Sequence, residues 1–260
     1  MKRLCLLIAI VGLFPFNDYA ETPEERGLAI ASAADRRDLG WNDSAADMKM
    51  ILHNRQGEKS ERAIRVRALE VQGDGDRLLT IFDYPADVKG TAFLSYTHAT
   101  EPDDQWLFLP ALKRVKRISS ANKSGPFMGS EFAYEDLSSQ EIAKYSYRYL
   151  RDDTVDGKSA FVIERIPQYK HSGYTKQIVW IDKEHYRSLK VEYYDRKGAH
   201  IKTLRLKDYQ QYLDKFWRAH RMEMVNHLNG KSTTLLWSPY QFKSGLTERD
   251  FDRNSLRRAR

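Results

Sequence analysis

The sequence predicts a mainly β protein built on one large, curled antiparallel sheet. Apolar and polar residues alternate with a period of two from about residue 45 to residue 238. Asp-Gly and Asn-Gly pairs separate several of these runs, and such pairs are strong hairpin signals. The regular alternation of strands and helices that builds a doubly wound sheet is missing. We count roughly ten strands, and a sheet of that size is expected to curl and form a concave face.

The first twenty residues predict a secretory signal peptide. Lys2 and Arg3 precede the apolar run LCLLIAIVGLF, and the small residue Ala20 marks the expected cleavage point. The run is short for a membrane span, so an uncleaved anchor is the less favoured alternative. Cleavage after about Ala20 leaves residues 21–260, enough for one large β domain or two small ones.

Cysteine and charge restrict the chemistry that the exported chain can carry. Cys5 is the only cysteine, and it stands at the start of the apolar run, where a lipoprotein signal would place it at the end. Its loss with the signal peptide would leave no disulfide, thiol nucleophile or thiolate metal site. The net charge of +7 predicts a surface that attracts anions, such as lipid headgroups, envelope polymers or acidic proteins. Export from the cytoplasm argues against nucleic acid as a natural binding partner.

Two segments outside the alternating region predict helices. Residues 22–39 can be capped by Thr22, with Pro23 at the first helical position and two glutamates in the first turn. The final stretch LTERDFDRNSLRRAR predicts a short helix that is capped by Thr247 and ends in arginines.

The sequence offers little support for an enzyme. The histidines form no HExxH or HxH pair, and Ser130 lacks the GxSxG frame of a nucleophile elbow. Glu135 and Asp136 are adjacent, so on a strand they would point to opposite faces and could not share acid-base work. We expect no catalytic residue, metal site or cofactor, although residues from distant strands could still converge.

The segment from Trp106 to Leu137 combines an apolar strand, a break at Pro110 and a cluster of cations. One explanation is an edge strand that lysines and arginines protect from aggregation. The other is a contact site for an anion or a partner at the rim of the sheet. The candidates for that contact are Arg114, Lys116 and Arg117.

Large apolar side chains are the candidates for lining a cavity, and core packing explains each of them equally well. Methionine is adaptable and would suit a lining for flexible acyl chains. The candidates are Phe93, Trp106, Phe108, Phe127, Met128, Trp180, Met222, Met224 and Trp237.

The motifs WLFLPALKRVKRI and FMGSEFAYEDL resemble the signature of the outer-membrane lipoprotein-sorting protein family, whose members often carry LPALRRVRRI and FMGSDFSYEDL. The departures are Lys113 and Lys116 in place of arginine and Glu131 in place of aspartate, and none of them changes the charge. The resemblance extends from near Met48 to the segment after Thr247.

This resemblance implies a half-open antiparallel β-barrel of the LolA/LolB type, with a few helices covering the concave face. It implies that residues 21–260 form a single lipid-carrier domain in the periplasm, without a cofactor. The ligand would be a lipid or the acyl chain of a lipoprotein, moved between envelope membranes. An inner-membrane transporter of the RND family is an expected partner. The alternative is a docking partner of a transporter that carries no lipid.

A lipid that crosses water must be shielded, since each buried methylene is worth about 0.8 kcal/mol. A movable lid or a plug over an apolar concave face would provide that shield. Residues 22–39 and the FMGSEFAYEDL stretch are the candidates for it, because each has apolar and polar sides.

Overall fold

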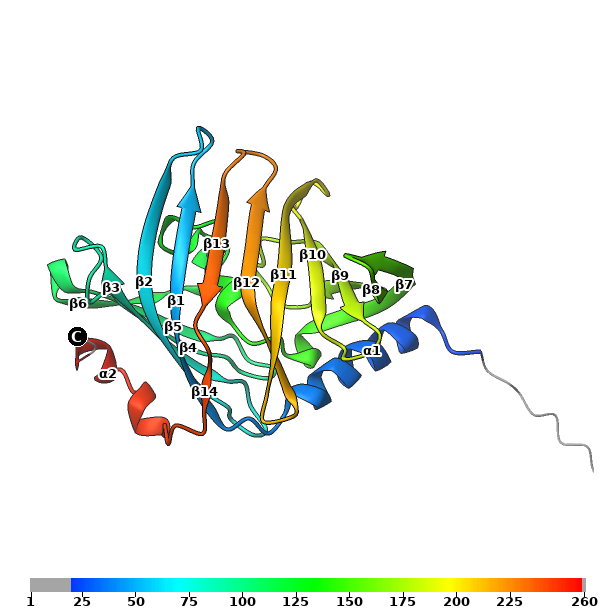
Figure 1. Ribbon diagram of the computed structural model, residues 1–260, viewed down its shortest axis with the longest axis horizontal. Coiled ribbons are helices and arrows are strands. Elements are labelled where there is room, and N and C mark those ends of the chain that lie inside the picture. The colour runs from blue at the N-terminus through cyan, green and yellow to red at the C-terminus, as the bar shows by residue number, and fades with distance from the viewer. Residues whose placement is uncertain (1–19, 259–260) are drawn as a thin grey trace, which may run out of the picture.

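The computed structural model describes residues 20–258, which form one antiparallel sheet of fourteen strands that does not close (Figure 1). The half-open, mainly β fold is thereby confirmed. The count exceeds the expected ten because short strands carry too few alternating residues to be recognised. The strands are β1 (Asp43–His53), β2 (Lys59–Leu69), β3 (Arg77–Tyr84), β4 (Ala92–Tyr96), β5 (Asp104–Leu109), β6 (Arg114–Ile118), β7 (Tyr145–Val155), β8 (Lys158–Pro167), β9 (Lys176–Asp182), β10 (Ser188–Tyr194), β11 (His200–Tyr212), β12 (Phe216–Asn226), β13 (Ser232–Trp237) and β14 (Gln241–Phe242).

The strands follow two meanders that meet in the middle of the sheet. The order is β6-β5-β4-β3-β2-β1-β13-β12-β11-β10-β9-β8-β7, and β14 pairs with the start of β1. At the junction, Met50 of β1 lies opposite Leu235 of β13. The two edge strands, β6 and β7, are consecutive in the chain. The chain must therefore cross from one edge of the open sheet to the other between them.

Residues 119–144 make this crossing, and we call them the plug segment. The segment lies inside the curl of the sheet and consists of short 3₁₀ turns (Figure 1). Phe127 is its apolar centre, 1% exposed, with ring contacts to Phe82 and Phe93 from the sheet and to Tyr134 from the plug itself. The FMGSEFAYEDL stretch thus lies within the core instead of over its surface.

Helix α1 (Pro23–Asp38) crosses the remaining part of the concave side beside β7 (Figure 1). Thr22 and Glu25 form a reciprocal capping box, which confirms the predicted helix start. Ile30 and Ala31 join the apolar cluster of the concave face. No helix among the described residues has the length and apolar character needed to cross a membrane.

The C-terminal segment lies on the outer face of the sheet. The expected single helix is a 3₁₀ turn, Glu248–Phe251, and a separate four-residue helix α2, Ser255–Arg258. Thr247 stands at the N-cap position of the first turn, and the Asp250 carboxylate accepts a hydrogen bond from its N–H at 2.8 Å. The chain is extended at Asp252, and this break lets both Phe251 and Leu256 be fully buried against β3, β4 and β5.

Gly27 sets how closely α1 approaches β7. A Cβ atom at this position would lie 2.7 Å from the backbone of Arg148 and Tyr149, which cannot move aside as a side chain can. We therefore expect Gly27→Ala to lower the free energy of unfolding by about 1–3 kcal/mol, although alanine favours helices. Urea titration measures the effect, and Leu28→Ala, at a position 46% exposed, is the control. A more stable Gly27→Ala protein would contradict this close packing.

Candidate functional site

A cavity of about 1370 Å³ lies between α1 and the concave face of strands β8 to β12. Pockets for small ligands usually span roughly 300–1,000 Å³, so this space is large enough for a lipid-sized ligand. We call it the α1 cavity. Its apolar wall includes Ile163, Val179, Ile181, Leu206 and Met222 from the strands.

Strand alternation explains why β8 and β9 give the cavity its apolar floor. Val179 and Ile181 of β9 point to the concave face and are 1% and 4% exposed. Ile178 and Trp180 point to the other face, where they belong to a separate apolar cluster. Because both faces of β9 are covered, its centre from Ile178 to Ile181 is continuously apolar, as buried strands usually are.

Acidic side chains line part of the same cavity. Burial raises the pKa of Asp76 to about 7, and a hydrogen bond from the Val71 N–H only partly opposes this. The nearby carboxylates of Glu141, Glu70 and Asp38 raise it further by repulsion. Burial also raises the pKa of Glu141 and Asp38.

Cations line the cavity as well. Arg218 forms an ion pair with Asp38 at 2.5 Å, and the Arg187 guanidinium binds Asp182 at 2.6 Å. Arg165 donates to Gln177. The cavity therefore combines an apolar wall with polar groups of both signs, an arrangement that suits an amphipathic ligand.

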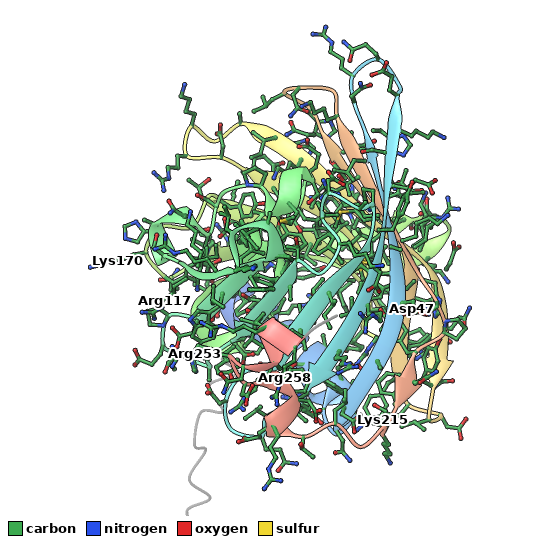
Figure 2. The ribbon with its side chains drawn as sticks, turned by 90° about the vertical axis from the view of Figure 1, so that its left-hand side faces the viewer. Asp47, Arg117, Lys170, Lys215, Arg253 and Arg258 are labelled. Atoms are coloured by element: carbon green, nitrogen blue, oxygen red, sulfur yellow. The ribbon has the colours of Figure 1, made fainter. Side chains whose placement is uncertain are left out.

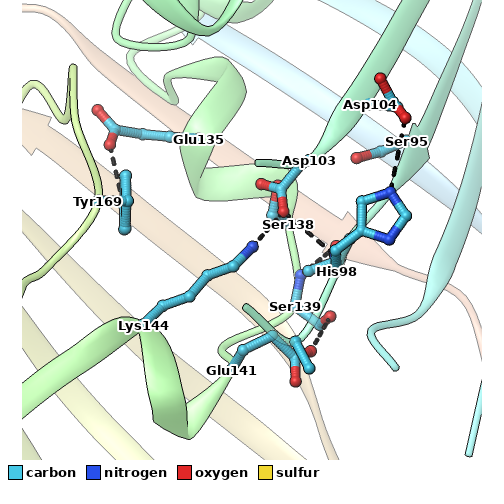
Figure 3. A network of polar contacts seen from close by, with 12 residues as sticks. Ser95, His98, Asp103, Asp104, Glu135, Ser138, Ser139, Glu141, Lys144 and Tyr169 are labelled. Atoms are coloured by element: carbon cyan, nitrogen blue, oxygen red, sulfur yellow. Dashed lines mark hydrogen bonds and ion pairs between the residues drawn. The ribbon is translucent and has the colours of Figure 1, made fainter. Parts of the chain in front are cut away.

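The plug segment is anchored by a buried ionic cluster. Asp103, from the loop before β5, binds the ammonium groups of Lys123 at 3.2 Å and of Lys144, and accepts a hydrogen bond from Ser138 at 2.9 Å (Figure 3). Burial alone would raise the pKa of Asp103, but the two lysines hold it below its ordinary value. Lys123 and Lys144 lie near the two ends of the plug segment, so one carboxylate anchors both.

A second set of anchors joins the plug to the loop after β8. The Glu135 carboxylate accepts hydrogen bonds from Tyr169, Ser172 and the Gly173 N–H, at 2.8–3.1 Å. The next residue, Asp136, accepts one from the Tyr174 hydroxyl at 3.0 Å. Burial raises the pKa of both carboxyl groups.

The expectation that these two carboxyl groups point apart is corrected here. They lie in a 3₁₀ turn, Tyr134–Leu137, and not in a strand. Both side chains contact the 169–174 loop, and we interpret them as anchors of the plug.

Backbone atoms of the plug bind the two halves of the sheet. The Arg62 guanidinium of β2 donates to the Met128 carbonyl. Lys202 of β11 donates to the Glu131 carbonyl at 2.8 Å, and the Glu131 N–H donates to Thr233 of β13 at 3.0 Å. The plug is thus fixed to the strands on both sides of the curl.

The structure distributes the predicted cavity residues over three regions. Met222 lines the α1 cavity. Met224 is completely buried in the core behind it, and Trp237 packs against the same cluster with its indole N–H unpartnered among the described residues. A second group, in and against the plug, consists of Phe93, Phe127 and Met128.

The remaining three aromatic candidates lie on the outer face of the sheet. Trp106 and Phe108 pack with Phe251 and Leu256 under the C-terminal segment. Trp180 belongs to the outer cluster at the other end of the sheet, where its indole N–H donates to Asp153 at 2.9 Å. The structure therefore separates these side chains from the concave face.

The basic candidates lie on β6, which is an edge strand of the sheet. Arg114, Lys116 and Arg117 are all exposed. Arg117 forms an ion pair with Asp104, from the neighbouring strand β5. This position agrees with the explanation that cations protect an open edge, and it leaves Arg114 and Lys116 available to a partner.

Sequence reasoning missed the aliphatic residues that line the cavity, namely Ile163, Val179, Ile181 and Leu206. Their alternation is visible in the sequence, but aliphatic residues that alternate are as typical of a core as of a cavity wall. Alternation shows which residues of a strand share a face, but it does not show which of the two faces is concave.

Among residues 20–258, no group of three or more His, Cys, Asp or Glu side chains is arranged to hold a metal ion. His200 and His227 both contact the Thr203 hydroxyl, at 2.9 and 2.8 Å. They are the nearest histidine pair that we find in the described chain, and their rings are 4.6 Å apart.

Comparison with known proteins identifies close relatives. A family model described as an uncharacterized protein matches residues 74–258. A domain from Vibrio parahaemolyticus, described as an outer membrane lipoprotein-sorting protein, is 62% identical, with 90% of this chain and 99% of that chain covered and a TM-score of 0.89. A DUF1329 family protein from Desulfovibrio piger is 28% identical, with the same coverage and a TM-score of 0.86.

A LolA superfamily protein from Nitrosomonas europaea is similar in fold alone. It is 20% identical, with 88% of this chain and 98% of that chain covered and a TM-score of 0.70. None of the curated proteins matches the chain.

Asp76 should make stability depend on pH. Its folded-state pKa of about 7 exceeds the ordinary value of 3.8. Its contribution to stability is therefore complete below about pH 4 and is lost as the pH rises through about 7. The asparagine side chain cannot ionise, but its amide oxygen can still accept the hydrogen bond from the Val71 N–H. We expect Asp76→Asn to match the wild type near pH 4 and to be more stable by roughly 1–3 kcal/mol at pH 8. Urea titrations of both proteins between pH 4 and pH 8 measure the difference in the free energy of unfolding. A difference that stays constant across this pH range would contradict the prediction.

Asp103 should be essential for the plug. Its replacement by asparagine leaves two ammonium groups, each less than 10% exposed, without a carboxylate. We expect Asp103→Asn to lower the free energy of unfolding by about 3–5 kcal/mol, as for other broken buried ion pairs. Asp83→Asn is the control, because the Asp83 and Arg65 side chains are about one third exposed. Equal losses in the two variants would show that Asp103 has no special role.

Proposed function

The chain belongs to the outer membrane lipoprotein-sorting protein family with a LolA-like fold, and from this premise we propose that it carries an acyl chain of a lipid or lipoprotein in the α1 cavity. The observation that supports the proposal most directly is the cavity itself. It has an apolar wall built by several strands and a volume of about 1370 Å³. Polar groups around that wall could contact a headgroup.

The energetics of lipid transfer require such a space. Each methylene removed from water is worth about 0.8 kcal/mol, so a free acyl chain crosses an aqueous compartment only very slowly. The aliphatic side chains of Ile163, Val179 and Ile181 would replace water around the chain. The polar residues would allow the headgroup to stay hydrated or paired.

We place this activity in the periplasm, between the membranes of the cell envelope. The predicted signal peptide supports export, although residues 1–19 lie outside the described part of the chain. The lipoprotein-sorting relative supports the same compartment. An RND-type transporter of the inner membrane remains our proposed partner, on the basis of the sequence resemblance.

Helix α1 is the proposed lid, whereas the plug is fixed. The buried surface of α1 is limited to Gly27, Ile30 and Ala31. Its polar contact with β7, between Glu24 and Arg148, is exposed at both side chains. The plug is instead anchored by the buried Asp103 cluster.

If α1 is the lid, the Gly27→Ala variant, in which α1 packs less closely on β7, should release a bound fluorescent fatty acid faster than the Leu28→Ala variant. Equal release rates in the two variants would exclude α1 as the lid.

The alternative function is an envelope protein that docks on a transporter and carries no lipid. The basic edge strand β6 fits that alternative as well as it fits a carrier. An enzyme is the least favoured class. Lipid content separates the first two, because only a carrier should retain lipid in the α1 cavity.

We expect lipid to co-purify with the protein from the native envelope and to be identified by extraction and mass spectrometry. Met222→Arg places a charge in the cavity wall and should reduce retained lipid and fluorescent fatty-acid binding by about tenfold or more. Val225→Arg, on the same strand at a position 42% exposed, is the matched control. Absence of lipid from the wild type, or equal binding by the two variants, would favour the docking alternative.

A further inference from the structure

Two neighbouring loops at one end of the sheet expose apolar side chains. They are residues 84–90, from the last residue of β3 onward, and residues 110–116, the turn between β5 and β6 with the start of β6; together we call them the basic rim. A Cβ atom on Gly90 would lie 3.3 Å from the Pro110 ring, so the two loops are in contact. Tyr84 in the first loop is 59% exposed, and Leu112 in the second is 67% exposed.

The same loops carry a strong excess of positive charge. Lys89, Lys113, Arg114 and Lys116 are exposed, and Asp87 is the single carboxylate in the two ranges. None of these four cations forms an ion pair with a carboxylate of residues 20–258. Arg117, the next residue of β6, differs because Asp104 neutralises it.

We propose that the basic rim docks the protein on the surface of an anionic lipid bilayer. Exposed leucine and tyrosine beside lysines and arginine match the two layers of a membrane interface, acyl chains below and negative headgroups above. Three of the four cations are lysines, whose long stems can extend to headgroups that have no fixed geometry. A specific acidic protein would instead favour a preformed site with defined hydrogen-bond partners.

The rim also defines how the docked molecule is oriented. Strand β3 runs from Arg77, beside the cavity-lining loop 70–76, to Tyr84 in the rim. The rim and the cavity-lining loop 70–76 therefore lie at opposite ends of β3, the strand labelled in Figure 1. The plug is connected to the rim through Met128, whose carbonyl accepts from Arg62, and the neighbour of Arg62, Ala63, pairs with Tyr84. A docked molecule directs α1 away from the bilayer.

Co-sedimentation with protein-free vesicles tests the docking. The vesicles are phosphatidylcholine alone or phosphatidylcholine mixed with phosphatidylglycerol. We expect the wild type to bind only the anionic vesicles, and less strongly as salt increases. The triple variant Lys113→Gln, Arg114→Gln, Lys116→Gln should lose about tenfold or more in partitioning, and Leu112→Ser about threefold or more.

The matched control removes three exposed lysines outside the rim, one at the start of β8 and two in loops: Lys158→Gln, Lys170→Gln and Lys197→Gln (Figure 2 shows Lys170). It changes net charge equally and should bind as the wild type does. An equal loss in the control would overturn the proposal, because the binding would then reflect net charge alone. Binding only to native membranes, and not to protein-free vesicles, would overturn it in favour of a protein receptor.

Orientation is tested with an environment-sensitive fluorophore, in a protein whose Cys5 is replaced by serine. A label on Leu112→Cys should shift to shorter wavelength on anionic vesicles and be quenched by brominated acyl chains. A label on Leu28→Cys, on α1 at a position 46% exposed and outside the cavity lining, should not change. Quenching at Leu28 alone would overturn the proposal. The docking goes beyond lipid carriage, and lipid retained by the rim variants, measured in parallel, shows separately whether carriage has failed.

Discussion

Asp103 forms ion pairs with two buried lysines, Lys123 and Lys144, and these pairs hold the plug segment inside the curled sheet. An open sheet that curls must cover its concave face, or a large apolar surface stays in water. The plug segment provides that cover, and Lys123 and Lys144 join regions near both of its ends to the one carboxylate. Ionic anchors of this kind contribute positional precision more than net stability, because desolvation offsets much of their attraction.

The plug also determines where empty space can exist. Phe127 and its ring contacts fill the half of the curl under β3 and β4. The half under β8 to β12 is bridged by α1, which buries only a few residues, so a cavity of about 1370 Å³ remains. One half of the concave face is thus a core, and the other is available to a ligand. The wide aliphatic floor there needs no exact ligand shape, which suits chains of variable length.

Two surfaces with different chemistry are connected by β3, because the basic rim begins at its last residue and the cavity-lining loop 70–76 precedes its first. The α1 cavity combines aliphatic residues with polar groups of both signs, whereas the basic rim combines cations with exposed Tyr84 and Leu112. A long, continuous sheet keeps these two surfaces at a fixed separation, because hydrogen-bonded strands connect them directly. Binding of a ligand at one end and contact with a membrane at the other can therefore occur at the same time.

The β class, the helix start at Thr22, the break at Pro110 and the family resemblance could all be predicted from the sequence, because each depends on local spacing or on a contiguous motif. Which face of each strand is concave became clear only from the folded sheet. Trp106 and Trp180 lie on the outer face of the sheet, whereas their neighbours in the chain, Leu107 and Val179, lie on the concave face. The cavity wall likewise comes from strands far apart in the chain, and their curvature has no local signal.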